Sequence, residues 1–230
     1  MDQITLKKEG ALVFDFDGTL CQLFINYDRN KLLFALHERM KFYDIEFSIE
    51  KDSFDVFSEI IRQTDSESAK REKALFDADQ ILTAAEIEAV NSGNPVNGVE
   101  AAFSIFARKN IPVGIATNNA TGCVEAFLNK CSLNTRIPMA GRVGVKPDFM
   151  KPNPWSILEV LSKLKCKPED TIFVGDTKRD YLASVKAGCD FIGMAPTEKK
   201  RKRLLEILPE KRIVSDFNEL MSFFQFYFQG

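Results

Sequence analysis

The sequence has no close pair of cysteines and no long apolar run. Its five cysteines are odd in number and scattered, and none forms the CxxC spacing of a metal site, so free thiols in a reducing compartment are expected. No window approaches the ~18 consecutive apolar residues of a transmembrane helix. The polar first ten residues lack the apolar core of a signal peptide. We therefore expect a cytoplasmic protein that does not bind membranes.

The chain also lacks a strong charge imbalance. Lysine plus arginine number 31 and aspartate plus glutamate 33, which gives a net charge of -2 and no electrostatic case for nucleic-acid binding. One local basic run, Lys199–Arg203, stands out. It is typical of the solvated face of a helix, with a partner-binding patch as the alternative. The sequence does not indicate the oligomeric state.

Short apolar runs alternate with amphipathic segments from Pro95 onward, which predicts a parallel sheet covered by helices on both faces. The expected fold class is α/β, with a doubly wound, Rossmann-like core. The predicted strands are Ala11–Phe14, Val113–Ala116, Ile137–Met139, Thr171–Val174, Asp190–Gly193 and a short Arg212–Val214. The predicted helices between them are Val99–Lys109, Thr121–Lys130, Pro154–Lys165 and Arg179–Ala187.

Residues 23–94 break this alternation and indicate helices throughout. The predicted helices are Asn30–Tyr43, Lys51–Gln63, Glu67–Asp79 and Thr83–Asn91, each with apolar residues at three- and four-residue spacing. We expect residues 1–22 and 95–230 to form the α/β core. Residues 23–94 are then an inserted all-helical cap over the carboxyl ends of the strands, where open parallel sheets bind ligands.

The most informative motif is Asp15-Phe16-Asp17-Gly18-Thr19-Leu20, directly after the first predicted strand. Strand side chains alternate between faces, so Asp15 and Asp17 reach one site only if the chain turns sharply after Phe16, and Gly18 permits such a turn. Two carboxylates so placed suit phosphoryl transfer, in which one attacks phosphorus and the other acts as acid and base. Taken alone, two acidic residues in such a loop are more often an ordinary turn or helix cap.

Three further polar clusters follow predicted strands. Thr117-Asn118-Asn119 precedes a helix whose amino terminus suits an anion, although an ordinary cap gives the same pattern. Lys151-Pro-Asn-Pro offers an ammonium to offset phosphate charge, and Lys146-Pro147 is its rival. Asp176 and Asp180 are oxygen ligands suited to magnesium. Parallel strands deliver all four clusters to one sheet edge, which favours a catalytic site.

These four clusters, in this order, resemble the motifs of the haloacid dehalogenase-like hydrolase superfamily, especially its phosphoglycolate-phosphatase-like members with a helical cap. The resemblance covers nearly the whole chain. It implies that Asp15 is a nucleophile that becomes an aspartyl phosphate and that Asp17 is the general acid and base. It also implies a magnesium ion held by Asp15, the backbone carbonyl of Asp17, and Asp176, with Asp180 as a ligand or beside them.

The same resemblance implies phosphate binding by Thr117 and Asn118, and it favours Lys151 over Lys146 because the Lys151 run enters a helix directly. Asp17 argues against dehalogenase and phosphonatase chemistry. After Leu20 the chain departs from many relatives with Cys21-Gln22-Leu23-Phe24, so the substrate is not implied. The cap offers four candidate substrate contacts, although residues of these types are more often ordinary surface residues: Asn26, Tyr27, Arg29 and His37.

The sequence thus predicts a magnesium-dependent phosphatase, a phosphoric monoester hydrolase that acts on a small phosphorylated metabolite through an aspartyl phosphate. Two alternatives remain open. A phosphomutase on the same scaffold would return the phosphoryl group to a sugar phosphate, and a binding protein on the same fold would have no turnover.

Overall fold

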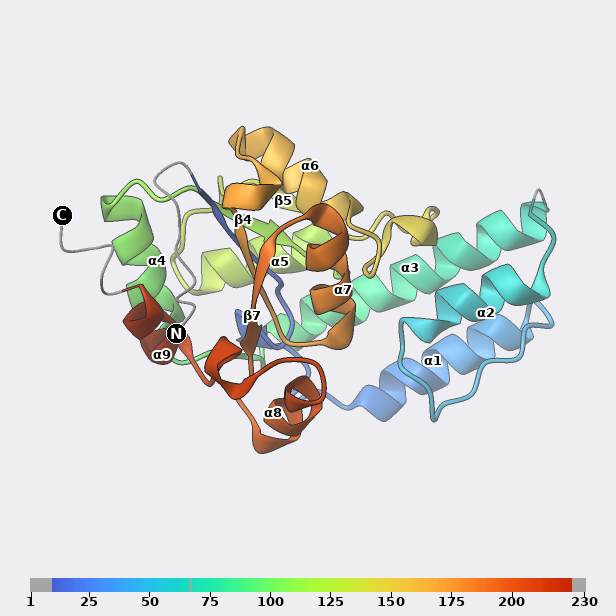
Figure 1. The fold of residues 1–230 in the computed structure, drawn as a ribbon. Coiled ribbons are helices and arrows are strands. Elements are labelled where there is room, and N and C mark those ends of the chain that lie inside the picture. The colour runs from blue at the N-terminus through green and yellow to red at the C-terminus, as the bar shows by residue number, and fades with distance from the viewer. Residues whose placement is uncertain (1–9, 67, 225–230) are drawn as a thin grey trace.

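A six-stranded parallel sheet forms the centre of the computed structural model, which describes residues 10–66 and 68–224 (Figure 1). The strand order is β5-β4-β1-β6-β7-β8, and every neighbouring pair is parallel. The predicted α/β fold is confirmed. The strands are β1 Leu12–Phe14, β4 Val113–Ala116, β5 Met139–Ala140, β6 Ile172–Gly175, β7 Asp190–Met194 and β8 Ile213–Val214.

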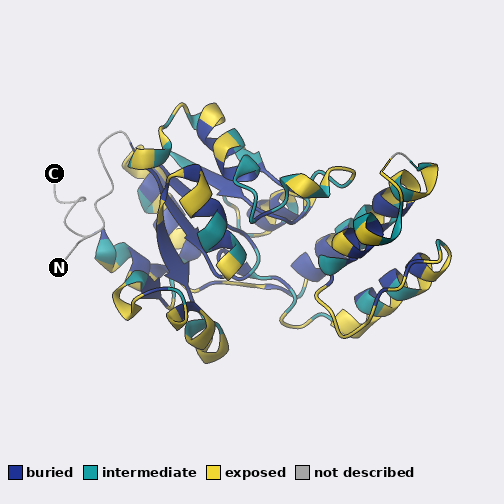
Figure 2. Cartoon of the chain, turned by 45° about the vertical axis from the view of Figure 1, so that its right-hand side comes forward, coloured by how far each residue is buried: buried dark blue, intermediate teal, exposed yellow. Residues whose placement is uncertain are grey.

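Helices cover both faces of this sheet. One face packs against α4 (Val99–Arg108), α5 (Thr121–Lys130) and α9 (Phe217–Phe223), and the other against helices α6, α7 and α8. The bounds of the second group are α6 Trp155–Leu164, α7 Lys178–Ala187 and α8 Glu198–Leu205. Three short 3₁₀ helices span Pro147–Phe149, Pro168–Asp170 and Glu210–Arg212. Figure 2 shows the central strands buried between these layers.

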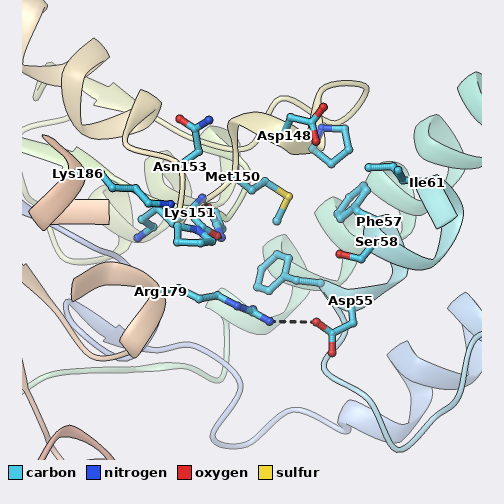
Figure 3. A pocket seen from close by; sticks show the side chains of 14 residues that line it. Asp55, Phe57, Ser58, Ile61, Asp148, Met150, Lys151, Asn153, Arg179 and Lys186 are labelled. Carbon is cyan, nitrogen blue, oxygen red and sulfur yellow. Dashed lines mark hydrogen bonds and ion pairs between the residues drawn. The ribbon is translucent and has the colours of Figure 1, made fainter. Parts of the chain in front are cut away.

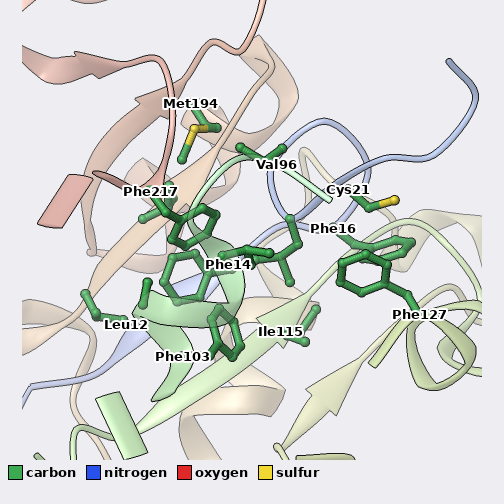
Figure 4. Close-up of a cluster of buried hydrophobic side chains, with 14 of the residues drawn as sticks. Leu12, Phe14, Phe16, Cys21, Val96, Phe103, Ile115, Phe127, Met194 and Phe217 are labelled. Carbon is green, nitrogen blue, oxygen red and sulfur yellow. The ribbon is translucent and has the colours of Figure 1, made fainter. Parts of the chain in front are cut away.

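Strand β1 illustrates how alternation divides the core. Leu12 and Phe14 point into one apolar cluster and Val13 into the other, as the two-residue period of a strand requires. Phe14 packs against Phe103 and Phe217, with ring centroids 5.5 and 5.6 Å away (Figure 4). These contacts fix β1 at the middle of the sheet, so the loop that follows it starts from a rigid point.

Three helices within residues 23–94 form a separate layer with its own apolar cluster. They are α1 (Arg29–Lys41), α2 (Asp55–Gln63) and α3 (Ala69–Val90), and they extend away from the sheet in Figure 1. Two short strands, β2 (Cys21–Gln22) and β3 (Asn94–Pro95), pair antiparallel where the chain enters and leaves this segment. The entry and exit are therefore side by side. No helix in the described part of the chain is long and apolar enough to cross a membrane.

Helix α3 corrects one sequence expectation. The sequence predicts two helices, Glu67–Asp79 and Thr83–Asn91, whereas the structure has one helix of 22 residues from Ala69 to Val90. No glycine or proline separates the two predicted helices, and the intervening Gln80-Ile81-Leu82 is compatible with a helix. The continuous helix runs from the far end of the segment back to the sheet (Figure 1).

A buried ion-pair network joins α3 to the sheet layer. The Arg142 side chain is 0% exposed and contacts Glu86 Oε1 at 2.7 Å and Asp79 Oδ1 at 2.6 Å. Glu86 also accepts hydrogen bonds from Asn119 Nδ2 and the Ala120 backbone N–H. Burial raises the pKa of Glu86, against the opposing effect of Arg142. The network thus ties α3 to the loop after β4.

We expect Arg142→Met to lower the free energy of unfolding by about 3–5 kcal/mol, because it leaves Glu86 charged and buried without its partner. Denaturant titration followed by circular dichroism measures this loss. The control is Arg212→Met, which removes a more exposed pair with Asp190 at 3.4 Å and should cost less than about 1 kcal/mol. Equal losses in the two variants would contradict the role given to the network.

Candidate active site

The loop after β1 brings both carboxylates of the first motif to one pocket. The Phe16 carbonyl accepts hydrogen bonds from the backbone N–H groups of Thr19, Leu20 and Cys21, which makes the chain turn sharply. Gly18 has φ +92°, a left-handed conformation that favours glycine. Asp15 and Asp17 consequently both line a cavity of about 200 Å³. Asp17 Oδ1 also accepts from the Leu23 N–H at 3.0 Å.

Lys151 lies between two buried aspartates. Its ammonium is 2.5 Å from Asp15 Oδ1 and 2.5 Å from Asp180 Oδ1, and it also donates to the Ala116 carbonyl at 3.0 Å. Burial alone would lower the pKa of Lys151, but Asp15 and Asp180 outweigh that effect and raise it. The lysine is therefore charged. Its rival Lys146 lies instead over the Phe149 ring, 5.5 Å from the centroid.

Asp15, Asp176 and Asp180 form a compact carboxylate cluster. Each offers an oxygen within 4.8 Å of the others, and all three residues are buried. Asp15 follows β1, and Asp176 and Asp180 follow the neighbouring β6, so the sheet edge brings the three together. Burial raises the pKa of Asp15 to about 6 and that of Asp176 to about 8, with Lys151 and Lys200 respectively opposing it.

This cluster fits a hard divalent cation. Among the described residues, Asp176 Oδ1 is buried and has no hydrogen-bond partner. A buried carboxylate oxygen without a hydrogen-bond partner lowers the stability of the folded protein unless a cation lies beside it. Carboxylate oxygens are also the ligands that magnesium prefers. The residues present therefore suit such an ion.

The segment Thr117-Asn118-Asn119 makes hydrogen bonds within itself and to the backbone of Lys151. Thr117 Oγ1 donates to Asn119 Oδ1 at 3.0 Å and accepts from the Asn119 N–H. Asn118 Oδ1 accepts from the Lys151 N–H at 2.8 Å, and Asn118 Nδ2 donates to the Lys151 carbonyl at 3.2 Å. Asn118 and Asn119 line the pocket that contains Asp15, whereas Thr117 is not among its lining residues. The Asn118 side chain thus positions the backbone that carries Lys151.

Helix α8 adds a second lysine to the site, which the sequence analysis did not identify. Lys200 Nζ pairs with Asp176 Oδ2, and a β-carbon at Gly18 would overlap both groups. Burial alone would lower the pKa of Lys200, but Asp176 outweighs that effect and raises it. Lys200 belongs to the basic run that was expected to be a solvated helix face. The sequence signal that could have identified Lys200 is its place in the chain. Helix α8 follows β7, so its first turn lies near the same edge of the sheet as the aspartates.

A second cavity of about 360 Å³ opens beside Lys151, between α2 and the segment before α6 (Figure 3). Phe57, Ile61 and Met150 give it an apolar side. At its edge Arg179 donates to Asp55 Oδ1 at 3.0 Å, which joins α7 to α2. The helical segment therefore covers the carboxyl edge of the sheet at this point.

Only one of the four candidate contacts proposed in the helical segment lines the described cavities. Arg29 lies on the wall of the pocket that contains Asp15. The other three form hydrogen bonds within the helical segment and its connections. Asn26 donates to the Ser92 carbonyl, Tyr27 donates to Glu88 Oε2, and His37 Nδ1 lies 2.6 Å from the Phe47 carbonyl oxygen.

Sequence comparison identifies related proteins. Residues 12–194 match the family described as haloacid dehalogenase-like hydrolase. A phosphoglycolate phosphatase of Photorhabdus laumondii is 27% identical over 125 residues, which are 54% of this chain and 52% of that protein. An uncharacterised hydrolase of Saccharomyces cerevisiae is 26% identical over 186 residues, 80% of this chain and 76% of that protein. The chain thus spans about half the length of the phosphoglycolate phosphatase.

Structural comparison agrees on the fold. A predicted phosphatase from Clostridium acetobutylicum superimposes with a TM-score of 0.67 at 17% sequence identity, covering 93% of this chain and 97% of that one. The family match includes Asp15, Asp17, Asn118, Lys151, Asp176 and Asp180, which line one pocket at the edge of the sheet. The predicted membership is confirmed: the chain belongs to the haloacid dehalogenase-like hydrolase family.

Proposed function

We propose that the chain is a magnesium-dependent phosphatase that hydrolyses a small phosphorylated metabolite through an aspartyl-phosphate intermediate. The observation that carries this proposal is the pairing of buried Asp15 with Lys151 in a pocket that also contains Asp17. A carboxylate with a fixed counter-ion and a second carboxylate nearby are the groups that two-step phosphoryl transfer requires. The matched phosphoglycolate phosphatase supports this reaction.

In the first step, Asp15 attacks phosphorus while Asp17 donates a proton to the departing alcohol oxygen. In the second, Asp17 accepts a proton from water, whose oxygen attacks the same phosphorus and releases inorganic phosphate and Asp15. Lys151 offsets negative charge on the transferring group throughout. The raised pKa of Asp17, which its burial causes, favours the protonated form needed at the start.

The carboxylates of Asp15, Asp176 and Asp180 and the backbone carbonyl of Asp17 would hold the magnesium ion. When bound, the ion supplies positive charge that stabilises the oxygens of the phosphoryl group. Thr117 and Asn118 are the proposed phosphate-binding residues. Asn118 already lines the pocket, whereas the Thr117 hydroxyl would exchange its Asn119 partner for a phosphoryl oxygen.

We also propose that residues 23–94 act as the cap of this enzyme, and residues 1–22 and 95–230 as its catalytic core. The ion pair between Arg179 and Asp55 supports this division because it holds α2 over the catalytic edge. Phe54, in the same part of the segment, lines both cavities. The cap would thus decide which leaving groups fit, and a cytoplasmic phosphate ester is the expected partner.

A panel of phosphorylated metabolites, scored by phosphate release with and without magnesium, tests this function. We expect release from at least one ester with magnesium, and a decrease of at least about 100-fold after chelation because the carboxylate cluster then lacks its cation. Adding magnesium back should restore release. Isomerisation of a sugar phosphate without release would indicate a mutase instead, and no release from any ester would contradict the proposal.

A further inference from the structure

Arginines from three separate elements line the pocket that contains Asp15. Arg29 comes from the start of α1, Arg179 from α7 and Arg203 from α8. The helical segment contributes one acidic residue to this pocket, Asp52, whose Oδ1 accepts a hydrogen bond from the Phe54 N–H at 3.0 Å. The pocket therefore combines three guanidinium groups with five carboxylates, of which Asp15, Asp176 and Asp180 already pair with lysines.

Two of these arginines form no direct ion pair among the described residues, although the charge of Arg29 opposes the raised pKa of nearby Asp17. Arg179 pairs with Asp55, but no ion pair joins Arg29 or Arg203 to a carboxylate in the described part of the chain. The Arg29 guanidinium lies over the Phe24 ring, 5.5 Å from its centroid. Arg29 and Arg203 are both exposed residues, so their side chains can contact a ligand that enters the pocket.

Helix α8 directs only part of its basic run toward the pocket. Lys200 and Arg203 are three residues apart, share one face of the helix and both line the cavity. Arg201 pairs instead with Glu210 at 3.0 Å. Lys199 and Lys202 are exposed and do not line this cavity. The basic run therefore contains Arg203, which lines the pocket, and also Lys199 and Lys202, which can serve as control positions.

No ion pair within the described residues joins a catalytic carboxylate to Arg29 or Arg203. Lys151 contacts Asp15 and Asp180, and Lys200 contacts Asp176, so these aspartates already have lysine partners. A phosphoryl group attacked by Asp15 would bind among them. A neutral leaving group would then offer Arg29 and Arg203 no anionic group of the substrate to bind directly. Guanidinium groups bind carboxylate and phosphate oxygens through paired hydrogen bonds.

We infer that the substrate carries a second anionic group, a carboxylate or a second phosphate, which Arg203 of α8 and Arg29 of α1 bind together. This inference rests on the proposed function, because it takes the first phosphate to be the one that Asp15 attacks. An anion held by both arginines also joins the helical segment to the sheet layer. Arg29 and Arg203 are thus specificity-determining residues.

Binding to an Asp15→Asn variant, measured by calorimetry with magnesium, tests this inference without turnover. Glycerol phosphate and phosphoglycerate share a three-carbon chain and differ in a terminal hydroxymethyl or carboxylate group. A hexose monophosphate and its bisphosphate test a second phosphate. We expect the more anionic member of at least one pair to bind about tenfold tighter, and the responding pair identifies which anion is accepted.

Adding Arg203→Gln or Arg29→Gln should reduce that preference at least about fivefold, whereas Lys199→Gln and Lys202→Gln should leave it within twofold. Equal affinity within both pairs, failure of all four compounds to bind, or a preference that survives both arginine changes would overturn the inference. Turnover of the panel by the unaltered protein is scored separately. Hydrolysis of neutral-alcohol esters without a charge preference would reject the second anion and leave the proposed function intact.

Discussion

Asp15→Asn should reduce hydrolysis of 4-nitrophenyl phosphate by about 10⁴-fold or more, because an amide oxygen does not form the aspartyl phosphate. The substitution keeps the shape of the side chain, and Lys151 retains Asp180 as a partner at 2.5 Å. The fold should therefore persist. Phosphate release at saturating substrate measures the loss, and far-ultraviolet circular dichroism checks the fold.

Asp190→Asn is the matched control for this change. Asp190 begins β7 and is exposed at the opposite end of the strand from the catalytic edge, so its loss should alter turnover less than about twofold. An Asp15→Asn protein that is folded and fully active would exclude Asp15 as the nucleophile. Loss of activity together with loss of the circular dichroism signal would instead reveal a structural role.

Lys151→Met should lower turnover by about 10³-fold, since it removes the charge that offsets both Asp15 and the phosphoryl group. It should also lower the free energy of unfolding by about 3–5 kcal/mol, because Asp15 and Asp180 are buried and lose a shared partner. Steady-state kinetics and denaturant titration measure the two effects on the same preparation.

Lys146→Met is the control for Lys151→Met, because the sequence offers both lysines as candidates for offsetting the phosphate charge. Its ammonium contacts the face of the Phe149 ring rather than an aspartate, so we expect turnover within about twofold of the unaltered protein. If Lys146→Met proved as damaging as Lys151→Met, the assignment of the charge-offsetting role to Lys151 would be wrong.

The sequence predicted those parts of the site that follow from strand position. Asp15, Asp176 and the Asn118 loop each follow a buried apolar strand, and parallel strands place such residues at one edge. Asp180 follows from the helical turn after Asp176. The direction of the strands was sufficient to predict where these residues lie, because each is within a few positions of a strand end.

Lys200 and Arg142 were not predicted because their partners are distant in sequence. Lys200 meets Asp176 across 24 positions, and Arg142 meets Glu86 across 56. A lysine in a basic run has the same local pattern whether it is solvated or paired. Only the packing of α8 against β7 and β8 determines which outcome occurs for Lys200.

The continuity of α3 escaped prediction for a different reason. Residues 80–82 have no feature that distinguishes a helix interior from a short connection, so the decision depends on what the neighbouring turns pack against. In the structure Leu82 is fully buried in the apolar cluster of the helical segment. Tertiary packing therefore favours an unbroken helix at that point.

The contact of Glu86 with Asn119 and Ala120 makes the helical insertion a poor candidate for deletion. Excising residues 23–93 and joining Gln22 to Asn94 is simple in geometry, since these two residues are paired between β2 and β3. The shortened protein would lack the carboxylates that Arg142 contacts and the acceptor for the loop beside Asn118. A shortened protein would therefore need another acceptor in place of Glu86 to hold Asn119 and Ala120 in their present positions.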